Sequence, residues 1–80
     1  MENKYLSILA ANATFTYWHY NEKNRTIFDV ANVNWFGSAW TMMNVGDYIL
    51  LNATDGAATL VVTKIEKNKV WTKVMSEVKY

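Results

Sequence analysis

The sequence is most informative between residues 34 and 56, which read Asn34-Trp35-Phe36-Gly37-Ser38-Ala39-Trp40-Thr41-Met42-Met43-Asn44-Val45-Gly46-Asp47-Tyr48-Ile49-Leu50-Leu51-Asn52-Ala53-Thr54-Asp55-Gly56. The first part is crowded with Trp, Phe and Met and has no helix cap. Gly46 then introduces an apolar strand, because glycine tolerates the positive φ that many turns require. Asp55-Gly56 ends that strand with a strong hairpin signal. The stretch therefore predicts turn, strand and turn, together with more large apolar surface than a small sheet needs for itself.

Further strands are predicted on both sides of this stretch. Thr and aromatic residues favour a strand over 14–20, and a polar turn at 21–24 leads to a second strand over 25–30. An irregular, aromatic-rich connection with a helical turn around 38–42 occupies 31–44. The remaining strands are expected at 47–53, 57–65 and 70–78, the last alternating cleanly between two faces.

The order of these elements predicts an all-β fold. Short turns join the strands, no proline interrupts them, and no βαβ rhythm is present. We expect one small domain over 14–80, a five-stranded antiparallel meander or barrel of SH3-like or OB-like build.

The first thirteen residues are expected to lie outside this domain. Tyr5, Ile8 and Leu9 would fall on one side of a short helix over 4–11, whereas an extended arm that orders only against a neighbour is favoured because an isolated short helix is marginal. Residues 1–13 are expected to act as an arm or tether that docks on a neighbouring subunit or on the underlying shell.

Size and composition favour association. Eighty residues allow one domain, which buries only about 60–65% of its unfolded surface and is marginal without support. There is no cysteine for a disulfide or a thiolate metal site, and a single histidine does not make a zinc site. A net charge of +1 argues against nucleic-acid binding, and no apolar run approaches the ~20 residues of a membrane span.

Catalytic chemistry finds little support in the sequence. His19 stands between Trp18 and Tyr20 with no nucleophile or carboxylate placed near it by spacing, so it is interpreted as a packed strand residue. Asp47 and Asp55 occupy turn positions, where Asp bonds to its own backbone. We therefore expect a protein that is not an enzyme, with no catalytic, cofactor or metal site.

The twelve aromatic residues allow three interpretations: a stacking platform for sugars or bases, ordinary core, or interface anchors. Phe15, Phe28 and Phe36 are assigned to the core. The strands at 47–53 and 70–78 are apolar on both faces, which indicates a second buried surface and favours the interface. The candidate interface residues are Tyr5, Leu6, Ile8, Leu9, Trp18, Tyr20, Trp35, Trp40, Met42, Met43, Tyr48, Leu50, Trp71 and Met75.

The central segment also carries a resemblance. Trp35-Phe36-Gly37-x-Ala39, then Val45-Gly46-Asp47-x-Ile49, then Asp55-Gly56 and the strand 59–63, resembles small virion proteins of tailed bacteriophages, such as capsid decoration, head-fibre and tail-associated modules. The resemblance implies a structural protein made in the bacterial host cytoplasm and built into the virion. Its expected partners are copies of itself, with a trimer favoured, and the major capsid or other virion proteins. The alternative is a module that binds a glycan or host surface through exposed tryptophans.

Overall fold

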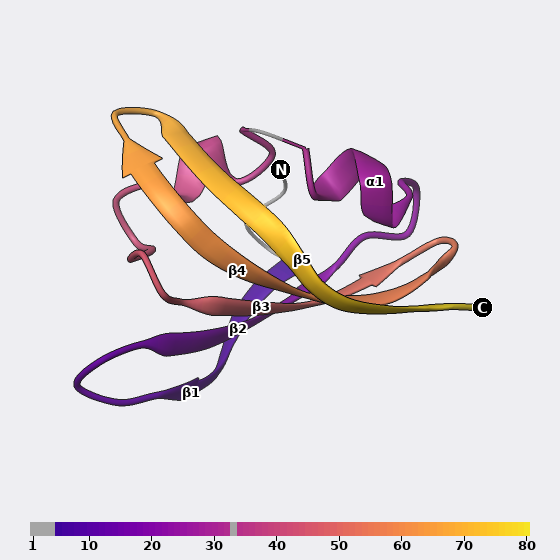
Figure 1. The fold of residues 1–80 in the computed structure, drawn as a ribbon, viewed down its shortest axis with the longest axis horizontal. Helices are drawn as coiled ribbons and strands as arrows, with labels where there is room; N and C mark the ends of the chain where they lie inside the picture. Colours follow the sequence, from indigo (N-terminus) through magenta and orange to yellow (C-terminus); the bar gives the residue numbers. More distant parts are fainter. Residues whose placement is uncertain (1–4, 33) are drawn as a thin grey trace.

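The computed structural model describes residues 5–32 and 34–80 as a five-stranded sheet with two short helical turns (Figure 1). The elements in chain order are β1 (Leu6–Ala11), β2 (Thr16–Asn21), α1 (Ile27–Val30), the 3-10 turn η2 (Gly37–Ala39), β3 (Tyr48–Ala53), β4 (Gly56–Glu66) and β5 (Lys69–Lys79). The strands lie in the order β1-β2-β3-β4-β5. No helix among the described residues is long and apolar enough to cross a membrane.

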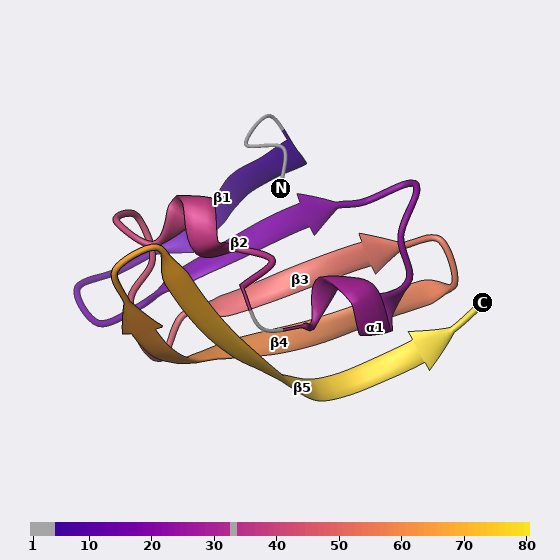
Figure 2. The same ribbon diagram turned by 90° about the horizontal axis from the view of Figure 1, so that it is seen from above.

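The sheet is mixed and open, which corrects the expected antiparallel meander or barrel. β2 and β3 run parallel, whereas β1–β2, β3–β4 and β4–β5 are antiparallel. A parallel pair needs a crossover, and residues 22–47 supply it with α1 and η2. Both helical turns lie over the same face of the sheet (Figures 1 and 2). The expectations of a mostly β fold and of an irregular connection are confirmed.

The core fills the space between the sheet and this crossover. Side chains from β2, β3 and β4 meet Ile27, Val30 and Phe36, all of them buried. The rings of Tyr20 and Phe36 pack edge to face with centroids 5.3 Å apart. The chain itself therefore covers this face of the sheet over β2, β3 and β4.

The predicted strand at 25–30 is wrong, because this segment begins helix α1. The hydroxyl of Thr26 accepts a hydrogen bond from the Asp29 backbone N–H at 3.2 Å, and the Asp29 carboxylate accepts one from the Thr26 N–H at 3.3 Å. This reciprocal capping box satisfies N–H groups that the first helical turn leaves unpaired. The apolar residues then split, with Ile27 and Val30 buried and Phe28 79% exposed, so the assignment of Phe28 to the core is also wrong.

The N-terminal segment belongs to the sheet from Leu6 onward. β1 pairs with β2 from Leu6 opposite Tyr20 to Ala11 opposite Thr16, with a bulge between Ile8 and Ala10. The Asn12 side-chain oxygen holds the hairpin turn by accepting from the backbone N–H groups of Thr14 and Phe15 at 2.8 and 3.1 Å. The expected short helix, and an arm outside the sheet, are therefore wrong for 6–11, while residues 1–4 lie outside the described residues.

Candidate functional site

The face of the sheet opposite α1 and η2 is the surface that the fold leaves available. On β3, Ile49, Leu51 and Ala53 are buried, whereas the alternate residues are half-buried. The half-buried residues of β3 pair with residues of the neighbouring strands that lie on the same face of the sheet. No other described segment forms a layer over this face (Figures 1 and 2). We define the open face by the residues that share it: Tyr17, His19, Asn21, Tyr48, Leu50, Asn52, Ala57, Thr59, Val61, Lys64, Trp71, Lys73, Ser76 and Val78.

A β-bulge decides which residues of β5 belong to the open face. Ser76 pairs with Thr59 and Val74 pairs with Leu60, so Met75 is an additional residue without a partner on β4. The alternation along β5 changes phase at this point. The clean alternation expected for the strand at 70–78 is therefore wrong: Val70 and Val74 lie opposite β4 residues of the core face, whereas Val78, which strict alternation would put on the same face, lies opposite Ala57 on the open face.

Aromatic rings gather at one end of the open face. The ring of Tyr48 packs edge to face against Phe15, with centroids 5.4 Å apart, and lies 6.2 Å from the ring of Tyr17. Phe15, assigned to the core from sequence, is instead half-buried beside this cluster. The three rings, together with Val61 in the same row as Tyr17 and Tyr48, form an apolar corner on the surface.

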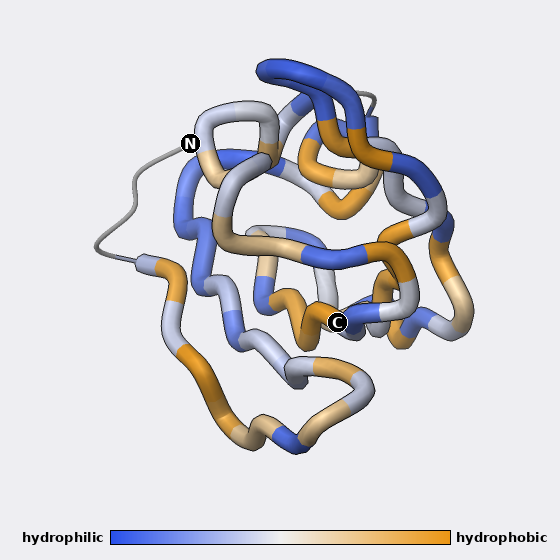
Figure 3. Tube along the Cα trace, turned by 90° about the vertical axis from the view of Figure 1, so that its left-hand side faces the viewer, coloured by the Kyte–Doolittle hydropathy of each residue, from blue (hydrophilic) through white to orange (hydrophobic). Residues whose placement is uncertain are grey.

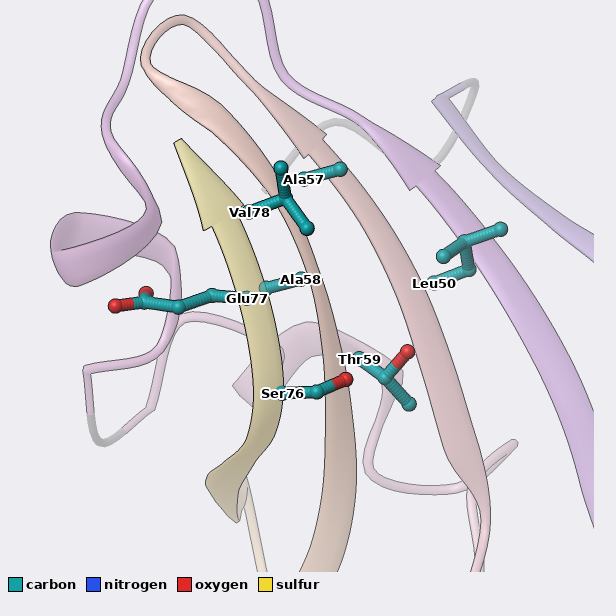
Figure 4. Close-up of a pocket in the computed structure, with 7 residues that line it drawn as sticks. All are labelled: Leu50, Ala57, Ala58, Thr59, Ser76, Glu77 and Val78. Carbon is teal, nitrogen blue, oxygen red and sulfur yellow. The ribbon is translucent and has the colours of Figure 1, made fainter. Parts of the chain in front are cut away.

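A shallow depression of about 140 Å³ lies at the other end of the face. Small side chains on β4 and β5, such as Ala57 and Ser76, form its floor, and Leu50 and Val78 stand beside it (Figure 4). Glu77 also borders the depression, but its carboxylate points away from the other labelled side chains (Figure 4). The depression is large enough for part of one apolar side chain.

Three polar side chains interrupt the apolar surface near this depression. His19 Nε2 lies 3.1 Å from the side-chain nitrogen of Asn52, and the hydroxyl of Tyr80 donates to the side-chain oxygen of Asn52 at 3.1 Å. His19 therefore takes part in a hydrogen-bonded row, in which its partner is the side-chain amide of Asn52.

The structure divides the predicted interface residues among three places. Trp18, Tyr20 and Met43 are buried in the chain's own core, so they are not available to a partner. Leu6, Trp35 and Trp40 are half-buried and pack against that core. Tyr48, Leu50 and Trp71 lie on the open face, whereas Tyr5, Ile8, Leu9, Met42 and Met75 are exposed elsewhere or at the bulge.

The sequence analysis missed several members of the open face. Tyr17 was treated only as part of a strand, and Ala57, Thr59 and Val61 were not singled out. The signal was the alternation in 57–62, where these three residues are interleaved with the buried Ala58, Leu60 and Val62. The position of Val78 on the open face depends on the bulge at Met75, which no local pattern predicts.

The acidic residues serve the fold. Asp47 is fully buried and accepts hydrogen bonds from the Thr16 N–H, the Trp18 indole N–H and the Asn44 N–H at 2.9 to 3.0 Å. Asp55 accepts from the Ile27 N–H and from Lys79, each at 2.9 Å. The Lys79 hydrogen bond, followed by the Ile27 bond, holds the pKa of the Asp55 carboxyl below its ordinary value of 3.8. Within the described residues, no three His, Cys, Asp or Glu side chains gather as metal ligands would.

Comparisons with protein-family models, with curated proteins and with solved structures found no match.

Proposed function

We propose that this protein is a non-enzymatic assembly protein that binds a second copy of itself through the open face. The observation that carries the proposal is the face itself, where aromatic and aliphatic residues from β2, β3, β4 and β5 lie together without a covering layer in the described structure. The large apolar side chains of the face are half-buried, apart from the exposed Val78, and an apolar surface without a covering layer is typical of interaction sites. Tyr48, Leu50 and Trp71, expected at an interface from the sequence, are among its members.

A second copy is the occupant that the chain favours. Eighty residues without cysteine have few other means of gaining stability, and the net charge of +1 brings little self-repulsion. The charged residues among those that define the open face are Lys64 and Lys73, and Lys64 is ion-paired with Glu66 at 3.1 Å, so two copies bring few unpaired like charges together. A face that packs on its own copy makes an isologous contact, which closes as a dimer. The trimer favoured by the sequence needs two different patches, and the measured mass distinguishes the two.

A place in a phage particle is the second part of the proposal. It is supported by the resemblance of 35–63 to small virion proteins, and it makes capsid or other virion proteins the further partners. The positions of the tryptophans favour assembly over the glycan-binding alternative. Trp18 is buried, Trp35 and Trp40 pack against the core, and Lys64 Nζ stands 4.9 Å from the centroid of the Trp71 ring.

Light scattering coupled to size-exclusion chromatography tests the self-association. We expect the wild-type chain to elute at twice its 9.2 kDa mass and to fall toward that mass on dilution. Leu50→Arg places a charge at the centre of the open face and should give a monomer. Phe28→Arg is the matched control, because Phe28 is exposed on helix α1, on the side of the sheet away from the open face. This substitution should leave the dimer intact.

Two outcomes would contradict the proposal. A wild-type chain that stays monomeric at millimolar concentration would show that the open face does not bind its own copy. Loss of association in Phe28→Arg with retention in Leu50→Arg would move the interface to the helical side. Circular dichroism of each variant shows that its sheet is retained.

A further inference from the structure

We propose that the row His19–Asn52–Tyr80 is a pH-sensitive element of the open face, and that protonation of His19 weakens the self-association. This inference rests on the proposed function and adds a regulation to it. It starts from the position of His19, which pairs in register with Leu50 at the middle of the face.

The hydrogen bonds define the protonation state in which the row fits together. Tyr80 donates its hydroxyl hydrogen to Oδ1 of Asn52, which turns the amide nitrogen toward His19 at 3.1 Å. An amide nitrogen only donates, so Nε2 of His19 must accept. The ring is then neutral and carries its proton on Nδ1.

A second proton on the ring removes this fit. Both ring nitrogens of a protonated histidine are donors, so Nε2–H would point at the amide hydrogens of Asn52. The contact is restored only if the Asn52 amide turns over, with Oδ1 accepting from His19 and the nitrogen donating to the Tyr80 oxygen. The charge on His19 therefore selects between two orientations of one side-chain amide.

Within residues 5–32 and 34–80, the register and hydrogen-bond neighbours of His19 include no carboxylate that would offset the new charge. Its neighbours in register are Ser7 on β1 and Leu50 on β3, and its hydrogen-bond partner is Asn52. The other titratable groups among the residues of the face and this row are Tyr17, Tyr48, Lys64, Lys73 and Tyr80, none of which is a carboxylate. Glu77 points away from the face (Figure 4).

Burial of the face against a second copy makes this charge unfavourable. An ion transferred from water into an apolar contact without a partner loses far more hydration free energy than a neutral group does. Each copy of the chain would bring one such ion into the contact. Histidine is the side chain whose ordinary titration falls between pH 5 and 8, and His19 is the single histidine of the chain. The dimer should therefore weaken as the solution is made mildly acidic.

The test compares dissociation constants from sedimentation equilibrium at pH 8.0 and 5.5 at one ionic strength. We expect the wild-type dissociation constant to rise at least about tenfold at the lower pH. A tenfold change corresponds to about one pKa unit of difference in proton affinity between the free and the associated chain. His19→Gln keeps a neutral side chain at both values, so its own ratio should stay near one. His19→Thr is a second neutral variant, used if the first does not fold.

Nitrogen NMR of the ring gives a readout that does not depend on assembly. At pH 8 we expect the proton on Nδ1, and the side-chain amide signals of Asn52 should shift together with the ring as pH falls. Tyr80→Phe removes one end of the row and should reduce that coupled shift.

Each negative result points to a different error. A wild-type chain that is monomeric at every pH overturns the proposed function, and this regulation with it. A dimer whose constant does not change with pH, or changes equally in His19→Gln, overturns only the regulation. A ring protonated on Nε2 at pH 8 overturns the hydrogen-bonded row.

Discussion

Asp47 is the residue on which the parallel strand pair depends. Its carboxylate lies at the start of β3 and is fully buried, and its oxygens accept hydrogen bonds from Thr16 and Trp18 of β2 and from Asn44 of the crossover. It thus joins three segments that are distant in sequence. The sequence analysis assigned it a local turn role, which covers only the short-range part.

Replacement of Asp47 should therefore affect stability strongly. Asp47→Asn keeps the shape but turns an amide donor toward groups that are themselves donors, and a buried unsatisfied group costs about 1–3 kcal/mol. We expect a loss of about 2 kcal/mol or more in the free energy of unfolding, measured by urea denaturation. Glu77→Gln, a change at an exposed carboxylate, is the control and should leave the midpoint nearly unchanged. Equal midpoints for the two variants would contradict this role of Asp47.

Asp55 gives stability a dependence on acid pH. Because its hydrogen bonds to Lys79 and Ile27 lower its pKa in the folded chain, its contribution is present above 3.8 and is lost as pH falls through the lowered value. Its partner Lys79 has a pKa raised above 10.5 by the same hydrogen bond, so that contribution is present below 10.5 and is lost at higher pH. The stability difference between wild type and Asp55→Asn in urea should be constant near neutral pH and shrink below 3.8. A difference that does not change with pH would show that the ion pair contributes nothing.

At the scale of elements, β1 and α1 are the two that differ most from the sequence-based expectation. The sequence of β1 is Leu-Ser-Ile-Leu-Ala-Ala. No strongly hydrophilic residue lies along this strand before the turn at Asn12 (Figure 3). Such an uncharged strand on an edge is unusual, because exposed edges commonly carry charged residues, as β5 does with its lysines. Its pairing with β2 makes it part of the chain's own fold.

Two substitutions separate this role of β1 from that of a tether. Leu6 packs against the core, whereas Ile8 is 58% exposed. We expect Leu6→Ala to lower the free energy of unfolding by about 1–2 kcal/mol, less than a fully buried leucine, and Ile8→Ala to change it by less than about 0.5 kcal/mol. Urea denaturation at a concentration where the chain is monomeric provides the measurement. Equal, negligible effects would instead support a segment that acts only on a neighbour.

At the scale of the whole molecule, one face of the sheet makes the core, and we propose that the other associates with a second copy. The stability of such a chain depends on its concentration, because a partner that binds only the folded state adds RT ln(1 + [L]/Kd). Raising the concentration about a hundredfold above Kd adds roughly 2.7 kcal/mol, and about 1 kcal/mol moves the Tm of a chain this size by 4–8 °C. Calorimetry should therefore show a Tm that rises with concentration in wild type and stays constant in Leu50→Arg. A concentration-independent wild-type Tm would argue against the dimer.

Local chemistry determined much of the fold in advance. A tight turn joins β3 to β4 where Asp55-Gly56 predicted one, although its two residues are Thr54 and Asp55 and Gly56 already pairs with Ala53. Gly46 has a φ of 95°, and the strands predicted at 47–53, 57–65 and 70–78 are present as β3, β4 and β5. Each depends on residues close together in sequence, which is why pattern and propensity were sufficient. The capping box of Thr26 and Asp29 was equally local, so α1 was within reach of the same reasoning.

Tertiary structure decided the features that depend on distant partners. Hydrogen bonds between strands determine that β2 pairs in parallel with β3 and that β1 lies in the sheet. The local sequence pattern does not contain this information. The bulge at Met75 reverses the sides of β5 because one residue without a partner shifts a period of two. The burial of Trp18 and Met43, and the exposure of Phe28, follow from where the crossover lies. Large apolar side chains look alike in sequence, and only packing determines whether each is used inside the chain or left for a partner.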